Sequence, residues 1–368
     1  MQSTKGMGAN EAYDPTKPYN AATNSVIEQT WGNADRWNLM IRRDGKRAEI
    51  IKDYRKPPWS RKGEAAGEKD ATDGTGTKGS IHFKALTFDY AAQDGFAMVA
   101  DDLIETGHVI YKLQDHLITE SDTGKGAAAI RGAIEGLVKV CNEHNVIVTG
   151  GETAVLNTID GFELGITGTG VRMYNPTGQL LQNDALIGLG SSGLHSNGFT
   201  FVRELYFDRL HYGLDSLVSG FVLGDALVRP TAIYLKELRR LLDEGGDKVH
   251  GLVHITGGGL TKLAELDPSG TLDISVAGPK MWPQPIFFDI FDRSRRYAGG
   301  LTVKEMFTKF NCGVGYVVAV DSGFAPRALD ILCAHNPRII GTAFPRDGEK
   351  SRVHIIDDPF KGMTFDLA

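Results

Sequence analysis

Short apolar segments with the pattern of β-strands alternate with amphipathic helical segments along most of this chain of 368 residues. Helical patterns cover residues 85–107 and 126–144, and strand patterns occur at 146–148 and 164–171. The alternation resumes further along with a strand pattern at 185–189. Alternation of this kind predicts an α/β fold, here built as two domains.

The predicted domains divide the chain into three parts. Residues 1–71 are rich in proline, glycine and charge, and we interpret them as an irregular N-terminal arm. Residues 72–175 are expected to form an N-terminal domain, and residues 176–368 a C-terminal α/β domain. A chain of this length can bury two separate cores.

Composition excludes several classes of partner. The formal net charge is -6, whereas a nucleic-acid surface needs clustered Lys and Arg. Cys141, Cys312 and Cys333 form no C-x-x-C pair, so we expect reduced thiols rather than a zinc knuckle or a disulfide framework. The N-terminal stretch has no apolar signal-peptide core, and no run approaches the ~20 apolar residues of a membrane helix. We therefore expect a cytoplasmic protein that binds neither nucleic acid nor membrane.

Four glycine-rich segments are the candidate ligand-binding loops: residues 73–79, 149–153, 190–198 and 256–259. Glycine lets the backbone approach a ligand closely and lets successive N–H groups converge on phosphate oxygens. The alternative for any one segment is an ordinary turn. Four in one chain, three of them beside a carboxylate, lysine or histidine, favour phosphate binding. Neither a Walker A motif nor a G-x-G-x-x-G after a strand is present, so an ordinary P-loop or Rossmann site is unsupported.

Acidic residues form a second candidate site. Asp73 opens the first glycine segment, and Asp94, Asp101 and Asp102 lie on the helix predicted after it. The spacing between Asp94 and Asp101 places both on one helix face, with Asp102 at its edge. Mg2+ takes oxygen ligands and commonly bridges carboxylates to substrate phosphates. The alternative is a solvated acidic face, but these acids lie among apolar residues, so we favour metal ligation.

Two basic residues in the glycine segments are further candidates. Lys78 ends the first segment, where its ammonium could meet a phosphate, and the alternative is a surface lysine. His195 lies in SSGLHSNG, where it could carry a proton or contact a phosphate, and the alternative is a loop histidine without a chemical role.

These motifs, in this order, resemble those of the aminoimidazole ribonucleotide synthetase family. The residues that carry the resemblance are TDGTGTK at 72–78, DGFAMVADDL at 94–103, TGGETA at 149–154, GLGSSGLHSNGF at 188–199, RPTAIY at 229–234, HITGGG at 254–259 and FNCGVG at 310–315. The similarity covers most of the chain, from residue 72 to about 345.

The resemblance implies an ATP-binding enzyme with Mg2+ as cofactor and a homodimer, in which the N-terminal domain dimerises through a β-barrel. It implies catalytic roles for Asp73, Lys78 and His195. The implied ATP and phosphate contacts are Gly74, Gly76, Thr77, Lys78, Gly150, Gly151, Glu152 and Thr153. The implied substrate contacts are Ser196, Asn197, Gly257, Gly258 and Gly259. The implied metal ligands are Asp73, Asp94 and Asp102, and the acidic pattern of this chain adds Asp101 as a fourth candidate ligand.

The implied reaction is the cyclisation of formylglycinamidine ribonucleotide to aminoimidazole ribonucleotide, with release of ADP and phosphate. The chain departs from the family pattern at four places. Asp101 stands where the family usually has Asn, and Val155 and Leu156 replace E-M. The family's glycine-rich segment upstream of the first motif is not recognisable, and the N-x-x-R after TGGG is absent. Two alternatives therefore stay open. One is a sister ATP-dependent enzyme with another small substrate, and the other is a catalytically silent dimeric homologue that binds nucleotide.

Overall fold

The computed structural model describes residues 18–44, 47–61, 64–159, 161–176, 178–297, 300–346 and 352–367. Its first half contains α1 (Pro18–Ile27), a 3-10 helix (Glu28–Trp37), β1 (Leu39–Asp44), β2 (Arg47–Lys52), β3 (Ser60–Arg61), β4 (Glu64–Ala65), β5 (Glu68–Gly74), α2 (Gly79–Ala85), α3 (Phe88–Glu105), β6 (His108–Thr119), α4 (Gly124–His144), β7 (Ile147–Val155) and β8 (Phe162–Arg172).

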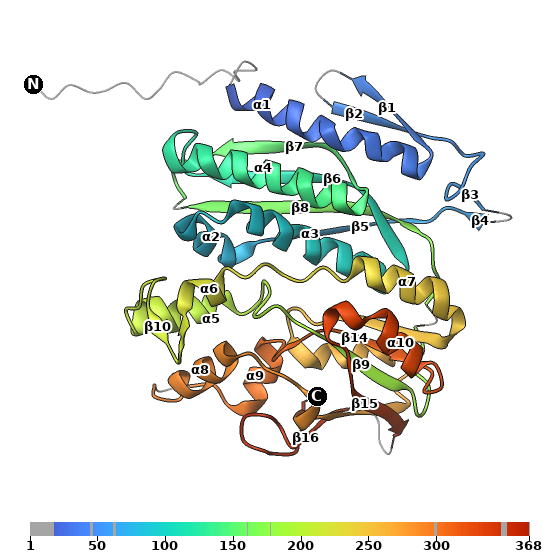
Figure 1. Cartoon of the computed structure of the whole chain (residues 1–368), viewed down its shortest axis with the longest axis vertical. Coiled ribbons are helices and arrows are strands. Elements are labelled where there is room, and N and C mark those ends of the chain that lie inside the picture. The colour runs from blue at the N-terminus through green and yellow to red at the C-terminus, as the bar shows by residue number, and fades with distance from the viewer. Residues whose placement is uncertain are drawn as a thin grey trace, which may run out of the picture.

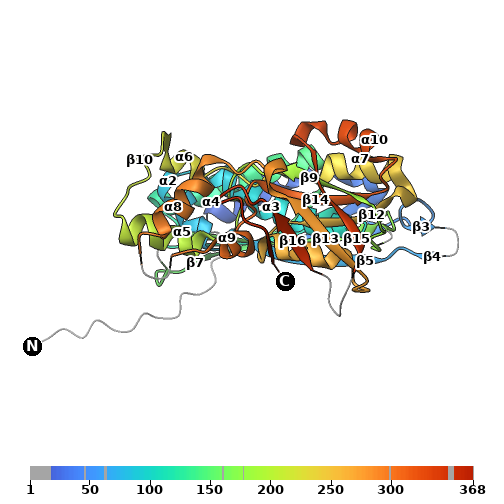
Figure 2. The same cartoon turned by 90° about the horizontal axis from the view of Figure 1, so that it is seen from below.

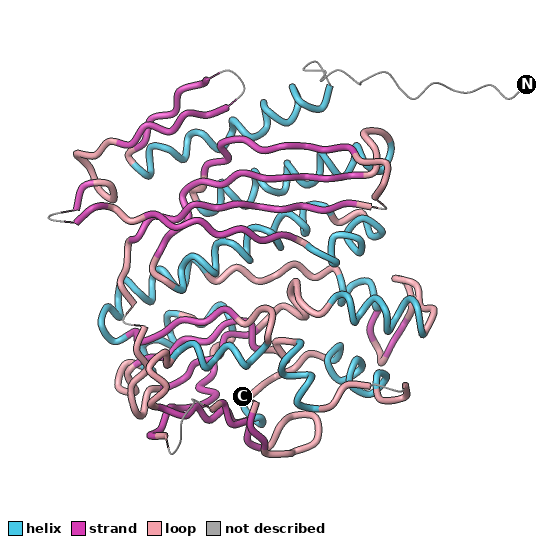
Figure 3. Tube along the Cα trace, turned by 180° about the vertical axis from the view of Figure 1, so that it is seen from behind, coloured by secondary structure: helices cyan, strands magenta, loops and turns pink. Residues whose placement is uncertain are grey.

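The first half is organised around an open sheet of four strands. Its order is β5-β8-β6-β7, in which β6 and β7 run parallel and the other neighbours run antiparallel. Helices α3 and α4 pack together on one face (Figure 1). Figure 3 shows the four strands from the opposite side, where no helix lies in front of them. The described strands close no barrel within the single chain.

The second half contains β9 (Ala185–Gly190), α5 (Phe199–Arg203), β10 (Leu217–Val218), β11 (Phe221–Val222), α6 (Leu223–Leu227), α7 (Leu235–Gly245), β12 (Val249–His254), β13 (Leu272–Ala277), α8 (Pro285–Ser294), α9 (Val303–Lys309), β14 (Val314–Val320), α10 (Ala325–Ile331), β15 (Arg338–Pro345), β16 (Val353–Ile356) and β17 (Phe365–Asp366). Seven of these strands form one mixed sheet in the order β12-β14-β9-β15-β13-β16-β17, which Figure 2 shows from below. The expected α/β class is confirmed.

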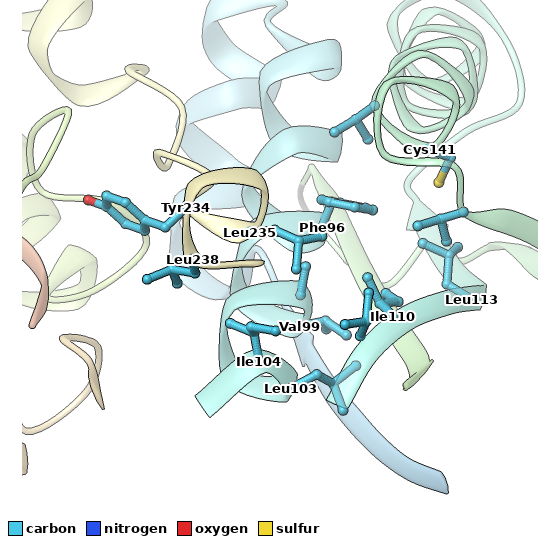
Figure 4. Close-up of a cluster of buried hydrophobic side chains, with 14 of the residues drawn as sticks. Phe96, Val99, Leu103, Ile104, Ile110, Leu113, Cys141, Tyr234, Leu235 and Leu238 are labelled. Carbon is cyan, nitrogen blue, oxygen red and sulfur yellow. The ribbon is translucent and has the colours of Figure 1, made fainter. Parts of the chain in front are cut away.

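Helix α3 joins the two halves. It packs against β5, β6 and β8 of the first sheet and against α7 and β12 of the second half. Figure 4 shows Phe96 and Val99 of α3 between Ile110 of β6 and Leu235 of α7. All four side chains are at most 1% exposed, and burying each contributes about 1.5–3 kcal/mol. The core is therefore continuous from one half to the other.

The expectation of an irregular arm over residues 1–71 is wrong for the described part of that segment. Helix α1, the following 3-10 helix and the β1–β2 hairpin precede β5. Tryptophans attach this segment to the rest, because the indole N–H of Trp31 donates to Val148 O (3.0 Å) and that of Trp37 donates to Asn145 O (2.7 Å). Such partners lie more than a hundred residues away, so local composition gave no sign of them. Residues 1–17 lie outside the described residues.

One predicted loop is part of a strand. Residues 149–153 lie inside β7, whose parallel pairing with β6 continues through them. The register shifts at Gly150, which has φ 149°, so glycine absorbs a bulge there rather than forming a loop. No helix among the described residues is long and apolar enough to cross a membrane.

Candidate active site

A cleft of about 460 Å3 opens where three of the four glycine segments meet. We number these three segments along the chain. The first (73–79) supplies Asp73, Gly74, Gly76 and Thr77. The second (190–198) supplies Ser196, Asn197 and Gly198, and the third (256–259) supplies Gly257 and Gly258. The remaining lining residues are Met98, Phe199, Thr200, Phe201, Thr308 and Lys309. The structure thus brings together most of the residues that the sequence assigned to phosphate and substrate binding.

The first segment turns sharply at the end of β5. A Cβ on Gly74 would lie 2.6 Å from the carbonyl oxygen of Leu164, so a larger residue would disturb the pairing of β5 with β8. The N–H of Thr75 donates to the same carbonyl (2.9 Å). The N–H of Gly74 donates to Asp73 Oδ1 (2.7 Å). These contacts fix the Asp73 carboxylate at the cleft.

The second segment is fixed by a side chain from far along the chain. Asn311 Nδ2 donates to the carbonyl of Gly193 (2.9 Å), and Asn311 Oδ1 accepts from the hydroxyl of Ser191 (3.1 Å). His195 and Gly198 both have positive φ, 57° and 78°, a conformation that glycine adopts without strain. Asn311 therefore holds this loop in shape beside the cleft.

Two carboxylates, Asp73 at the cleft and Asp102 on α3, interact electrostatically. Burial raises the pKa of Asp73, the N–H of Gly74 opposes that rise, and the negative charge of Asp102 raises the pKa further. Asp102 is paired with His254, whose Nδ1 lies 2.9 Å from Asp102 Oδ1. The Asp102 side chain is still 36% exposed, so it can accept another ligand.

The structure does not place Lys78 at an open phosphate site. Its side chain is 0% exposed, and its ammonium is bonded to Asp94 (2.8 Å) and to the carbonyl of Arg229 (2.7 Å). Asp94 also bonds His82 Nε2 (2.7 Å) and accepts from the N–H and hydroxyl of Thr231 (both 2.7 Å). Burial lowers the pKa of Lys78, whereas the charge of Asp94 raises it.

The same contacts remove Asp94 from the predicted metal site. Burial alone would raise the pKa of Asp94, but the charge of Lys78 and the hydrogen bond from His82 outweigh it and lower the pKa to about 2. Both carboxylate oxygens are occupied by protein donors. Asp94 and Lys78 are therefore an internal ion pair that links the two halves, and both sequence assignments need this correction.

Asp101 also points away from the cleft. It is buried, and its carboxylate accepts the backbone N–H of Tyr234 (3.1 Å). Burial raises the pKa of Asp101 well above its ordinary value; the Tyr234 N–H opposes this rise and the charge of Asp102 adds to it. The expectation that Asp101 adds charge to a metal site is wrong in this geometry, because the helix turns this side chain toward α7.

His195 is likewise internal. Its side chain is 1% exposed, and Nε2 accepts the N–H of Ser192 (3.2 Å). Burial lowers its pKa well below the ordinary value, and the electrostatic interaction with His254 lowers it further. A neutral, enclosed imidazole does not fit the expected proton carrier or phosphate contact.

The glycine motif at Gly150, Gly151, Glu152 and Thr153 does not reach the cleft of its own chain. It lies on β7, the edge strand opposite β5, and Gly151 and Glu152 are exposed there. The remaining predicted substrate contact, Gly259, is the last residue of the segment 256–259 and is buried.

Sequence reasoning missed His254, Lys262 and Lys309. His254 stacks on Tyr316, and its buried Nε2 has no hydrogen-bond partner in the part of the chain that the structure describes. Lys262 Nζ lies 3.0 Å from Thr256 Oγ1, and its charge lowers the pKa of Asp73. His254 opens the HITGGG motif and Lys309 immediately precedes FNCGVG, so their positions in these motifs were the available signal.

The fit of the residues to a divalent cation is partial. Among the described residues, no group of three or more His, Cys, Asp or Glu side chains is arranged to hold a metal ion. Asp73 and Asp102 are suitable oxygen ligands beside the cleft, whereas Asp94 and Asp101 are not. Mg2+ commonly takes only one or two carboxylates and completes its shell with waters and substrate phosphates, so a bound nucleotide would have to supply further ligands.

Comparisons with known proteins cover both halves of the chain. Residues 70–172 match the N-terminal domain of AIR synthase related proteins, and residues 182–354 match their C-terminal domain. A phosphoribosylformylglycinamidine cyclo-ligase from Thermococcus kodakarensis is 37% identical over 72% of this chain and 75% of its own length. A protein of the same name from Nitrosococcus oceani is 34% identical over 77% of this chain and 78% of its own.

Solved structures share the fold at lower identity. A thiamine-monophosphate kinase from Stenotrophomonas maltophilia superposes with a TM-score of 0.61 at 14% identity, over 92% of this chain and 97% of its own. HypE from E. coli, a hydrogenase maturation protein, superposes with a TM-score of 0.58 at 16% identity, over 94% and 96%. At these identities the likeness concerns the fold alone.

The buried ion pair gives a first prediction. Lys78→Ala leaves the Asp94 carboxylate buried without its cation, so we expect a loss of about 3–5 kcal/mol of folding stability and a lower Tm. Lys78→Met combined with Asp94→Asn removes both charges and should melt above Lys78→Met alone. Calorimetry on these variants, with the exposed Lys84→Ala as control, measures the difference. A Tm of Lys78→Ala equal to that of the control would contradict the assignment.

Asp101 gives a second prediction. Its folded-state pKa lies above the ordinary value of 3.8, so ionisation in the folded state costs stability as pH rises past that value. Asp101→Asn removes this cost. We expect the free energy of unfolding of the variant, relative to that of wild type, to rise by about 1.4 kcal/mol per pH unit between the unfolded and folded pKa values of Asp101. Melting curves from pH 5 to pH 8 test this, with the exposed Asp122→Asn as control. A difference in stability between Asp101→Asn and wild type that does not change with pH would contradict this prediction.

Proposed function

We propose a function for this chain from the premise that it belongs to the AIR synthase related protein family, within which it matches the phosphoribosylformylglycinamidine cyclo-ligases. The reaction is the ATP-dependent cyclisation of formylglycinamidine ribonucleotide to aminoimidazole ribonucleotide, with release of ADP and phosphate. The observation that supports it best is the single cleft where the segments around Asp73, Asn197 and Gly258 meet. Such a cleft can hold two phosphate-bearing substrates against each other.

The chemistry asks for positioning and charge neutralisation. The formyl amide oxygen is a poor leaving group until it receives the terminal phosphoryl group of ATP, after which the amidine nitrogen displaces it as phosphate and closes the ring. Glycine backbone N–H groups suit phosphate oxygens because they approach without side-chain obstruction. Under this proposal Gly74, Gly76 and Thr77 contact ATP. Ser196, Asn197 and the Gly257–Gly258 backbone contact the ribonucleotide.

Mg2+ is part of the proposal, with a smaller ligand set than the sequence suggested. Asp73 and Asp102 would hold it, and the bound ion would neutralise charge on the ATP phosphates. His254 orients Asp102 through its Nδ1 contact. Lys78 and Asp94 take a positioning role, because their contacts hold α3 against the backbone of residues 229–231.

We also keep the division into domains 72–175 and 176–368 as part of the proposal. The matches to the two family domains support it, since the first match ends at residue 172 and the second begins at residue 182. The segment Gly150–Thr153 lies outside the cleft of its own chain. Under this proposal it would contact ATP only in the cleft of a second copy of the chain.

The third prediction concerns the catalytic role of Asp73. Purified protein with ATP, Mg2+ and formylglycinamidine ribonucleotide should form ADP and the aminoimidazole product in equal amounts. Asp73→Asn should lower kcat by about a hundredfold, comparable with the loss of one preorganised electrostatic contact, with little change in Tm. Asp89→Asn, exposed at the start of α3, is the matched control.

The outcomes of this assay separate the alternatives. ATP binding without aminoimidazole formation, but with ADP release on another small substrate, would favour a sister enzyme. ATP binding without any turnover would favour a silent homologue. Unchanged kcat in Asp73→Asn would remove Asp73 from the reacting centre even if wild type forms the product.

A homodimer formed through the first sheet is the fourth prediction. The apolar segment at 109–113 does not supply the interface, because Val109, Ile110, Tyr111 and Leu113 are at most 1% exposed within one chain. The face of the β5-β8-β6-β7 sheet that no helix covers (Figure 3) supports the proposal instead. Light scattering at micromolar concentration should give twice the mass of 40.0 kDa. Thr167→Arg, exposed on β8, should shift the mass toward monomer, whereas a monomeric wild type would contradict the proposal.

A further inference from the structure

We propose that Lys309 binds the phosphate monoester of the ribonucleotide substrate, an inference that rests on the function proposed above. Among the described residues that line the cleft, Lys309 carries the one cationic side chain. A phosphate monoester brings close to two negative charges into the cleft. A protein with a net charge of -6 needs a local cation to receive it.

The packing of α9 brings Lys309 to the cleft. Lys309 is the last residue of this helix. The ring of the next residue, Phe310, lies directly against Gly198 of the second segment, where any Cβ would overlap it. Gly259 of the third segment lies in the same way against the carbonyl oxygen of Phe307. Two glycines thus let the end of α9 sit between the two segments expected to contact the ribonucleotide.

The charge of Lys309 is not neutralised within the described part of the chain. Its side chain is exposed and makes no hydrogen bond or ion pair there. Glu305, one helical turn earlier, interacts electrostatically with Lys309. The Glu305 carboxylate, however, accepts the backbone N–H and the hydroxyl of Thr302 (both 2.8 Å) in a capping box. The ammonium is therefore available to a ligand.

An unpaired donor in the same cleft points to the same kind of ligand. Asn197 Nδ2 is buried and has no hydrogen-bond partner among the described residues. Leaving such a donor unpaired costs about 1–3 kcal/mol, and an oxygen-rich ligand would relieve that cost. Asn197 lies beside Gly257, whose backbone leaves room for a phosphate. A cation, an amide donor and a glycine backbone together form an oxyanion site.

The acidic surroundings of Asp73 favour separate positions in the cleft for the two phosphate-bearing substrates. Asp73 at the end of β5, with Asp102 beside it, repels a phosphate that carries no metal and favours the metal-bridged phosphates of ATP. The end of α9 offers Lys309 instead. The monoester therefore lies at Lys309, and the reacting amide extends toward Asp73.

Binding measurements on Lys309 variants form the test, with ribose 5-phosphate and ADP as probes in isothermal titration calorimetry. Lys309→Ala should weaken ribose 5-phosphate binding about tenfold, as expected for one charge-assisted contact, and leave ADP binding within about twofold. Lys309→Arg should bind nearly as wild type does. Lys304→Ala on the same helix, exposed and outside this cleft, is the matched control. Because the Lys309 side chain is exposed, Tm should not change.

In turnover assays, Lys309→Ala should raise KM for formylglycinamidine ribonucleotide about tenfold with little change in kcat. Equal ribose 5-phosphate affinity in wild type and Lys309→Ala overturns the proposal, as does equal weakening of ADP and ribose 5-phosphate. Failure of the proposed function is distinguishable, because wild type would then form no aminoimidazole product, whereas selective loss of ribose 5-phosphate binding would still support the phosphate site.

Discussion

The buried ion pair between Lys78 and Asp94 is the contact on which the cleft depends. Two opposite charges taken out of water are costly unless each meets further partners, and here the partners come from both halves of the chain. Lys78 donates to the carbonyl of Arg229, and Asp94 accepts the N–H and hydroxyl of Thr231. The second half cannot move from α3 without breaking these hydrogen bonds to the buried pair. This contact fixes the distance between the first glycine segment and the other two.

Helix α3 shows how one stretch of sequence gives its carboxylates different properties. Asp94 meets a lysine and a histidine and stays ionised, whereas Asp101 meets a backbone N–H in an apolar setting that disfavours its charge. Asp102, the next residue, turns toward His254 and remains partly exposed. Only this last environment suits a ligand for a metal ion. Helical rotation of about 100° per residue separates Asp101 from Asp102, so adjacent acids serve stability and chemistry respectively.

Glycine in this protein acts mainly by allowing close packing, and the ligand-binding geometry is a result of that packing. Gly74 lets β5 pair closely with β8, while Gly198 and Gly259 accept the end of α9. Each contact positions a polar residue at the cleft: Asp73 before Gly74, Asn197 before Gly198 and Lys309 at the end of the helix. A side chain at any of these glycines would displace an element rather than only block a ligand. The same glycines therefore allow the close packing around the cleft and bring the candidate phosphate-binding residues to it.

The sequence alone determined the α/β class, most of the elements that carry motifs and the segments that meet at the cleft, because periodicity, turn residues and motif order are local properties. It did not determine which polar side chains face ligand. The sequence predicted that Lys78, Asp94 and His195 contact ligand. Each is instead enclosed by residues far away in sequence; Thr231, for example, donates to Asp94. The contacts of Trp31 and Trp37 with the rest of the chain and the separation of Glu152 from the cleft are also long-range. Burial and hydrogen-bond partners are set by what packs on a segment, and only the tertiary structure decides that.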